Sequence, residues 1–203
     1  MDLGAALKAF AAVFPAELPD KTMIATVVLV ARYRRPLLVW LGAAAAFTVH
    51  VVIAVAAGQL LSLLPDAVVT VATATLFFVG AVVLWRESRQ ADKPDDEDHQ
   101  VADAHDGDAS AGRSDMSVVA ASFGVIVLAE WGDLTQLATA GIAASTGEPV
   151  AVAIGALLAL WSVAGLAAAL GRTIAARLPV NRLQRGAAFV FGGLALLTLS
   201  ELL

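Results

Sequence analysis

Six long apolar stretches constrain this chain more than any other feature of its sequence. They can be read at about residues 3–31, 37–63, 67–86, 117–145, 149–176 and 183–203. A helix rises about 1.5 Å per residue, so each stretch is long enough to cross a hydrocarbon core of roughly 30 Å. The chain is also 59% hydrophobic and only 15% charged, whereas soluble domains are more polar. We therefore predict an all-α membrane protein with six transmembrane helices in a lipid bilayer.

The basic residues indicate how these helices are oriented. Eleven of the thirteen lie in or beside the first, third and fifth loops, and the second and fourth loops have none. Cytoplasmic loops of membrane proteins carry the excess of Lys and Arg. The odd-numbered loops are therefore expected in the cytoplasm, with the N- and C-termini outside. Asp2 stands where a signal peptide would have basic residues, so the first stretch is expected to remain a helix of the protein.

The second half of the sequence repeats the first after 113 residues. This shift aligns Glu17 with Glu130, Asp20 with Asp133, Thr22 with Thr135, Thr26 with Thr139, Pro36 with Pro149, Gly42 with Gly155, Gly58 with Gly171 and Gly80 with Gly193. Each half holds three apolar stretches, an odd number, so the second half enters the membrane in the opposite sense. Inverted repeats are typical of secondary transporters, whose substrate site lies near the midplane where the halves meet.

The domain organisation follows from this repeat. We expect a first three-helix repeat over residues 1–86, an acidic linker over 87–116 and a second, inverted three-helix repeat over 117–203. The linker holds ten of the eighteen acidic residues and few apolar ones, which predicts a flexible cytoplasmic segment. Its alternative role is a weak cation collector, helped by His99 and His105.

Two pairs of acidic residues lie inside apolar stretches. Glu17 and Asp20 lie about halfway along the first, and Glu130 and Asp133 about halfway along the fourth. A spacing of three residues puts both members of a pair on one helix face. An isolated charge at this depth costs several kcal/mol, and such residues commonly mark an ion path. We expect the four carboxylates to converge on one cavity between the halves.

Such a cluster can exchange a cation for protons, because both compete for the same oxygens. The further candidate ligands are the hydroxyls of Thr22 and Thr135, the amide of Gln136, and backbone carbonyls. Local unwinding at Pro15, Pro19 and Gly132 is expected to expose these carbonyls toward the cavity. Oxygen ligands suit Mn²⁺, Ca²⁺ or Mg²⁺ better than Cu(I) or Zn²⁺. Met23 occupies the position of Gln136 in the repeat and is a soft candidate ligand, although packing is its commoner role.

The acids also have a purely structural interpretation, in which Lys21 pairs with Asp20 to hold two helices together. One lysine cannot neutralise four acids, and the repeat places Leu134 opposite it. Lys21 is instead expected to tune or cap the site. Trp131 is expected either to form a wall of the cavity or simply to pack against its neighbours. His50 lies opposite Val163 in the repeat, which favours a packed, hydrogen-bonded histidine over a proton relay.

The two motifs carry a family resemblance. ELPDKT at residues 17–22 and EWGDLTQ at residues 130–136 resemble the paired Glu-x-Gly-Asp-(Lys/Arg)-(Thr/Ser) signatures of the Golgi manganese/calcium transporters and small bacterial manganese exporters. The resemblance implies a cation/proton exchanger for Mn²⁺ or Ca²⁺ in a bacterial plasma membrane. It also implies that Glu17, Asp20, Glu130 and Asp133 form the metal site. Pro19 replaces the first signature glycine and Leu134 the second basic residue, which affects ion preference and pH dependence.

Two other function classes stay open at this point. An exporter of amino acids or small organic cations would use the carboxylates to bind a cationic group. An intramembrane aspartyl protease would need two aspartates in a Gly-x-Gly-Asp context, whereas each half here supplies a Glu and an Asp. The sequence contains no cysteine and no nucleic-acid, nucleotide or prosthetic-group motif, so the metal ion is expected as a transported substrate and the protein as a transporter, not an enzyme. The oligomeric state is not predicted.

Overall fold

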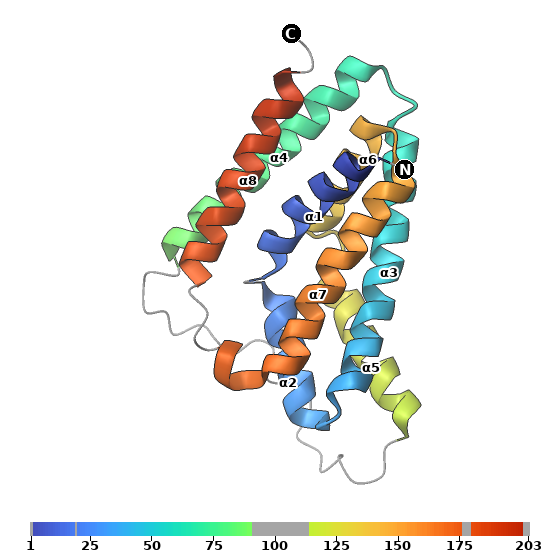
Figure 1. Ribbon diagram of the computed structural model, residues 1–203, viewed down its shortest axis with the longest axis vertical. Helices are drawn as coiled ribbons and strands as arrows, with labels where there is room; N and C mark the ends of the chain where they lie inside the picture. The colour runs from blue at the N-terminus through green and yellow to red at the C-terminus, as the bar shows by residue number, and fades with distance from the viewer. Residues whose placement is uncertain (1, 19, 91–113, 176–179, 201–203) are drawn as a thin grey trace.

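The described part of the chain is entirely helical, as the sequence predicts. The computed structural model describes residues 2–18, 20–90, 114–175 and 180–200. Within them lie α1 (Leu3–Glu17), α2 (Lys21–Tyr33), α3 (Pro36–Leu61), α4 (Asp66–Gln90), α5 (Asp115–Ala129), α6 (Leu134–Thr146), α7 (Pro149–Ala175) and α8 (Val180–Ser200). Figure 1 shows them running mostly along the long axis of the molecule.

The helices have the length and composition of a multi-pass membrane protein. Among the described residues, three helical segments are long and apolar enough to cross a membrane: Pro36–Leu61, Asp66–Arg86 and Pro149–Ala169. The pair α5 and α6 adds a fourth if it is counted as one span, bent by 75°. The six-span inverted arrangement itself stays a prediction.

The first and fourth apolar stretches are interrupted beside their acids, where prolines and a glycine in the sequence indicate local unwinding. Each is divided in two, between α1 and α2 and between α5 and α6. Pro15 lies near the end of α1, where it lacks the N–H that a helix interior requires. Gly132, between α5 and α6, adopts a φ of 74°, a left-handed conformation that favours glycine. Both breaks interrupt the stretch beside its pair of acids.

The helix bounds follow the repeat in the sequence. α2 and α6 begin and end 113 residues apart, and α3 and α7 begin 113 residues apart. The packing partly follows it too, since α1 packs against α7 and α3 against α5, while α4 lies beside α8. α4 extends to Gln90, four residues beyond the expected end of the first repeat. The rest of the predicted linker up to residue 113 lies outside the described residues.

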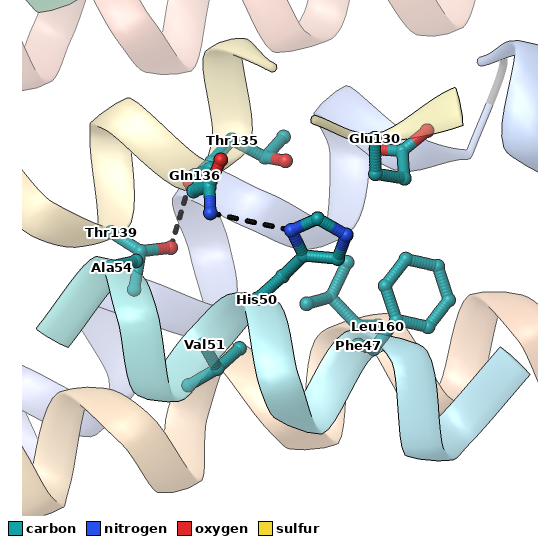
Figure 2. Close-up of a pocket in the computed structure, with 9 residues that line it drawn as sticks. All are labelled: Phe47, His50, Val51, Ala54, Glu130, Thr135, Gln136, Thr139 and Leu160. Atoms are coloured by element: carbon teal, nitrogen blue, oxygen red, sulfur yellow. Dashed lines mark hydrogen bonds between the residues drawn. The ribbon is translucent and has the colours of Figure 1, made fainter. Parts of the chain in front are cut away.

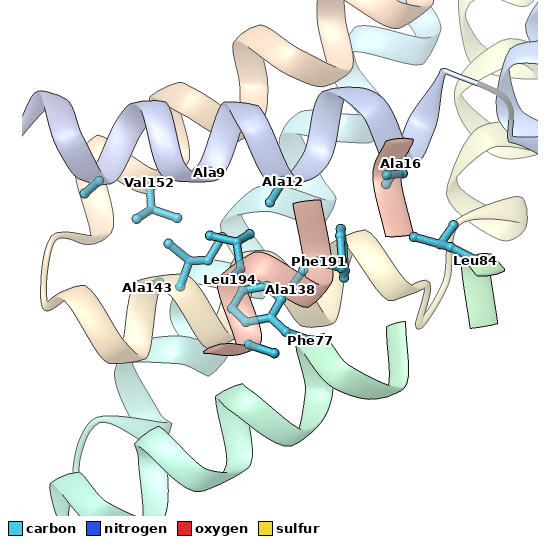
Figure 3. Packing of buried hydrophobic residues seen from close by; sticks show 14 of the residues in the cluster. Ala9, Ala12, Ala16, Phe77, Leu84, Ala138, Ala143, Val152, Phe191 and Leu194 are labelled. Atoms are coloured by element: carbon cyan, nitrogen blue, oxygen red, sulfur yellow. The ribbon is translucent and has the colours of Figure 1, made fainter. Parts of the chain in front are cut away.

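A hydrophobic core joins helices from both halves. Figure 3 shows Phe77 of α4 against Phe191 of α8, with ring centroids 5.6 Å apart and nearly perpendicular. Small residues of α1, among them Ala9 and Ala12, are fully buried against this cluster. Small side chains let helix backbones approach closely, which holds helices together where lipid offers no hydrophobic driving force.

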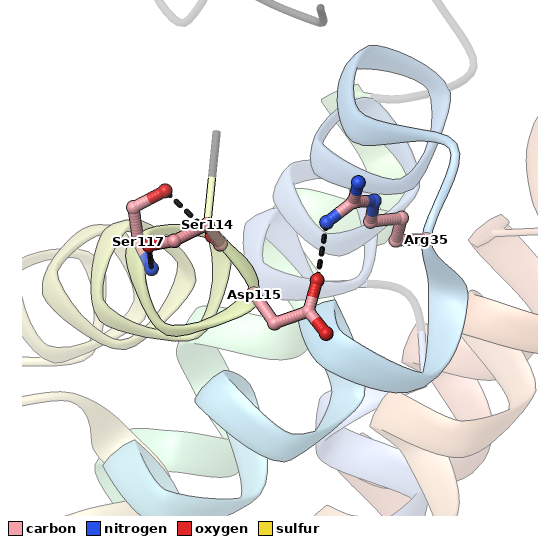
Figure 4. A network of polar contacts seen from close by, with 4 residues as sticks. All are labelled: Arg35, Ser114, Asp115 and Ser117. Atoms are coloured by element: carbon pink, nitrogen blue, oxygen red, sulfur yellow. Dashed lines mark hydrogen bonds and ion pairs between the residues drawn. The ribbon is translucent and has the colours of Figure 1, made fainter. Parts of the chain in front are cut away.

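One polar contact joins the halves at the end of the molecule where α2 ends and α5 begins. Arg35 forms an ion pair with Asp115, and Ser114 caps α5 by accepting the N–H of Ser117 at 3.3 Å (Figure 4). Both charged side chains are substantially exposed, so the pair contributes little stability.

Candidate metal centre

The two helix breaks place the acids at equivalent positions in the two halves. Glu17 is the last residue of α1 and Asp20 precedes α2, while Glu130 directly follows α5 and Asp133 precedes α6. The Asp20 N–H donates to the Glu17 carbonyl at 3.2 Å, and the Asp133 N–H donates to the Glu130 carbonyl at 3.2 Å. The aspartates do not cap α2 or α6 with their side chains. The same turn therefore presents two carboxylates in each half.

All four carboxylates meet at one point between the halves. One oxygen from each of Glu17, Asp20, Glu130 and Asp133 lies within 4.8 Å of the others. Ligands on opposite sides of a calcium-sized cation, each held at 2.3–2.6 Å, are about 5 Å apart. The separation of these oxygens thus fits one divalent cation. Glu17 is completely buried and Glu130 is 3% exposed, so bulk water does not screen their charges.

Two threonines orient the glutamates across the boundary between the halves. Thr22 donates a hydrogen bond to Oε1 of Glu130, and Thr135 donates one to Oε1 of Glu17 at 2.6 Å. A shift of 113 residues converts one bond into the other. Each glutamate is therefore oriented by the signature hydroxyl of the opposite half, so the centre needs both halves to form.

One glutamate oxygen at this centre is able to accept a further ligand. Oε2 of Glu17 is buried and has no hydrogen-bond partner within the described residues. An unpaired carboxylate oxygen inside a protein is costly. Four carboxylates this close must be neutralised by protons, by a cation or by both. The arrangement can therefore hold a divalent cation in one state and protons in another.

A small cavity of about 10 Å³ adjoins the carboxylates between α3 and α6. Figure 2 shows His50 between Gln136 and Glu130, all of which line this cavity. The Gln136 amide nitrogen lies 3.3 Å from Nδ1 of His50, and the amide oxygen accepts the Gly132 N–H at 3.0 Å. In this structure Gln136 thus bonds the helix break and His50 rather than contributing directly to the four-carboxylate cluster.

His50 is the residue at this centre that the sequence indicates least clearly. It is buried and hydrogen-bonded, which fits the packed interpretation, and it also lines the cavity beside Phe47 and Leu160 of the hydrophobic core. Its Nε2 has no hydrogen-bond partner within the described residues. A polar residue inside an apolar stretch could have indicated a functional position. The repeat argued against this, because the residue aligned with His50 is Val163.

Met23, Trp131 and Leu134 lie outside the carboxylate cluster. Met23 is buried in a hydrophobic cluster with Val163 of α7. Trp131 is 70% exposed, with its ring perpendicular to His50 at 6.1 Å. Leu134 packs against the core that contains α4 and α8. Pro19 and the side chain of Lys21 fall outside the described part of the structure, so their predicted effects on the site stay predictions.

Comparison with known proteins identifies the family. A family model described as divalent cation/proton antiporter GDT1 matches residues 5–92 and 118–203, on both sides of the acidic segment. The chain is 33% identical over 175 residues to the GDT1-like protein sll0615 of Synechocystis sp., covering 80% of each protein. No solved structure matches the chain. The chain therefore belongs to the GDT1 family of divalent cation/proton antiporters, which are transporters with the divalent cation as their substrate.

Proposed function

We propose that this protein exports Mn²⁺ from the cytoplasm in exchange for protons, with Ca²⁺ as the second candidate substrate. The observation that carries the proposal is the meeting of four carboxylates, from both halves, within 4.8 Å of one another. Oxygen ligands suit Mn²⁺ and Ca²⁺. The family assignment supports a divalent cation over the organic cations considered from the sequence, and it removes the protease alternative.

In the proposed cycle, Glu17, Asp20, Glu130 and Asp133 lose protons as they bind the cation from the cytoplasm. The two halves then move so that the centre faces the other side, where protons displace the cation. Exchange is coupled because the oxygens cannot hold both ligands at once. Thr22 and Thr135 keep the glutamates aligned during this competition through the hydrogen bonds they donate.

The proposed arrangement in the membrane is the six-span inverted repeat predicted from the sequence. The two broken stretches, α1 with α2 and α5 with α6, each count as one span, so the centre lies near the midplane. The loop between α2 and α3 and the acidic segment after α4 face the cytoplasm, and the termini face outward. Discontinuous helices at the site are common in secondary transporters, which supports this arrangement.

Replacing either threonine by valine should weaken cation binding. Thr22→Val and Thr135→Val preserve side-chain volume but remove a hydrogen bond to a carboxylate, commonly a contribution of about 1.5–3 kcal/mol. We expect the Kd for Mn²⁺ to rise about tenfold or more in each variant. Isothermal titration of the purified protein measures this. Thr75→Val is the control, because the exposed Thr75 donates its hydrogen bond to the Val71 carbonyl of its own helix. Equal affinities in all three variants would contradict the assigned role.

The proposed substrate and direction are tested in inside-out membrane vesicles, where export appears as uptake. A proton gradient directed outward from the vesicle lumen should drive Mn²⁺ uptake. Excess Ca²⁺ should compete partly, whereas arginine and choline should not compete. Two results would refute Mn²⁺ as the substrate: organic cations block the uptake, or no proton gradient drives any uptake of Mn²⁺. Stronger competition by Ca²⁺ than by unlabelled Mn²⁺ would make Ca²⁺ the primary substrate.

A further inference from the structure

The repeat pairs the small cavity beside the carboxylates with a region of very different character. The cavity is lined by His50 and Ala54 of α3 and by Gln136 of α6. A shift of 113 residues maps these three residues onto Val163, Ala167 and Met23. Those residues pack together, with Val27, into a buried hydrophobic cluster between α2 and α7. The same position thus has polar side chains beside a small cavity in one half and a buried hydrophobic cluster in the other.

The cavity and the cluster lie on opposite sides of the four carboxylates. α6 runs from the helix break toward the end of the molecule where α3 ends and α7 begins, and it packs against α3. α2 runs from its break toward the other end, where α3 begins, and it packs against α7. A path to the centre between α3 and α6 and a path between α2 and α7 would therefore open to opposite faces.

The two regions also differ in how well they can receive an ion. The α3–α6 side offers polar groups on His50, Gln136 and Thr139, and His50 is 4% exposed. On the α2–α7 side, Met23 and Val163 are 4% and 2% exposed and belong to a buried hydrophobic cluster. Apolar constrictions exclude water and ions, and can therefore act as gates.

We propose that these regions are the two segments of the transport path. The cavity between α3 and α6, with His50 and Gln136, is the open segment, and Met23 with Val163 forms the closed gate of the segment between α2 and α7. This assignment rests on the proposed function, since it concerns the route of the same cation to the same carboxylates. Met23 and Val163 thereby become residues that control passage without binding the ion.

Cysteine accessibility tests the assignment directly, because the natural chain has no cysteine. Ala54→Cys and Ala167→Cys are a matched pair: both are alanines related by the repeat, 2% and 0% exposed. Each variant is reconstituted without Mn²⁺ and treated with a small, impermeant thiosulfonate added to one face at a time. We expect Ala54→Cys to react from one face at least tenfold faster than Ala167→Cys reacts from either face. Equal rates, or no reaction at Ala54→Cys, would overturn the assignment.

A gate-opening variant supplies an independent readout. Met23→Gln combined with Val163→His gives the α2–α7 side the polar residues found on the α3–α6 side. We expect proton leak into proteoliposomes without added cation to rise at least tenfold, while Met116→Gln, at an exposed methionine of α5, leaves it unchanged. A folded double variant with wild-type leak would count against the gate. Mn²⁺ flux by the unmodified protein is measured beside both tests. If this flux is absent, the proposed function is refuted, independently of the result for the gate.

Discussion

Glu17→Gln and Glu130→Gln should each reduce Mn²⁺ transport by about 100-fold or more. Each substitution keeps the shape of the side chain and one oxygen, but removes one of the four negative charges that surround the site. The loss follows because the remaining carboxylates bind a divalent cation less tightly and have one fewer group that exchanges a proton. The two variants should behave alike, since each glutamate accepts a hydrogen bond from the threonine of the other half. Initial rates of Mn²⁺ uptake into proteoliposomes measure the effect.

The matched control for these variants is Glu148→Gln. Glu148 lies between α6 and α7, is partly buried, and is not a member of the carboxylate cluster. Its replacement should leave the rate within about twofold of the wild type. A normal rate in either Glu17→Gln or Glu130→Gln, with the protein folded, would contradict the assignment of that glutamate to the ion site.

Gly155→Ala should be among the most destabilising single-methyl substitutions in this protein. A Cβ at Gly155 would lie 2.1 Å from the carbonyl oxygen of Ala6, so α1 and α7 would have to separate. The aligned residue Gly42 makes the equivalent approach to Val119, at 2.5 Å. Overpacking commonly costs about 1–3 kcal/mol, and a contact with backbone lies at the upper end because the backbone cannot rotate away. A fall of several degrees in the Tm of the detergent-solubilised protein is the expected result.

Gly192→Ala provides the comparison. A Cβ at Gly192 would meet no atom within 4 Å, and alanine is the better helix former. The Tm should stay the same or rise slightly. If Gly155→Ala lowered the Tm no more than Gly192→Ala does, the result would contradict the close packing of α1 against α7 at Gly155.

The positions of the acids could be predicted from the sequence, because a charged residue within an apolar stretch is energetically unfavourable and easily recognised. Charged residues inside apolar stretches are expensive, so Glu17 and Glu130 stand out without any structural information. The repeat then indicated that the two pairs belong to one centre, and the structure brings the four carboxylates together. The reciprocal bonds from Thr22 and Thr135 also connect residues that the repeat had aligned, although nothing in the sequence shows that these bonds cross between the halves.

The features that sequence reasoning missed depend on packing between distant residues. The sequence indicates local unwinding near Pro15 and Gly132, because these residues permit a helix break, but it does not give the geometry of the break. The left-handed conformation of Gly132 and the bond from its N–H to Gln136 are visible only in the structure. His50 was similarly obscured, since its role depends on the cavity that α6 forms with α3. The alignment of His50 with Val163 suggested that His50 is a packed residue. In the structure, these two aligned positions differ in their surroundings, a cavity around His50 and a hydrophobic cluster around Val163.

The most direct test of the central claim is simultaneous measurement of cation and proton movement. Purified protein is reconstituted into proteoliposomes that contain a pH-sensitive dye, and Mn²⁺ is added outside with the membrane potential held at zero. Exchange at the carboxylate centre predicts that Mn²⁺ enters while the lumen becomes alkaline, and that both signals disappear together in Glu130→Gln. Mn²⁺ entry without a change in luminal pH, or flux that persists in Glu130→Gln, would contradict exchange of the cation for protons at this site.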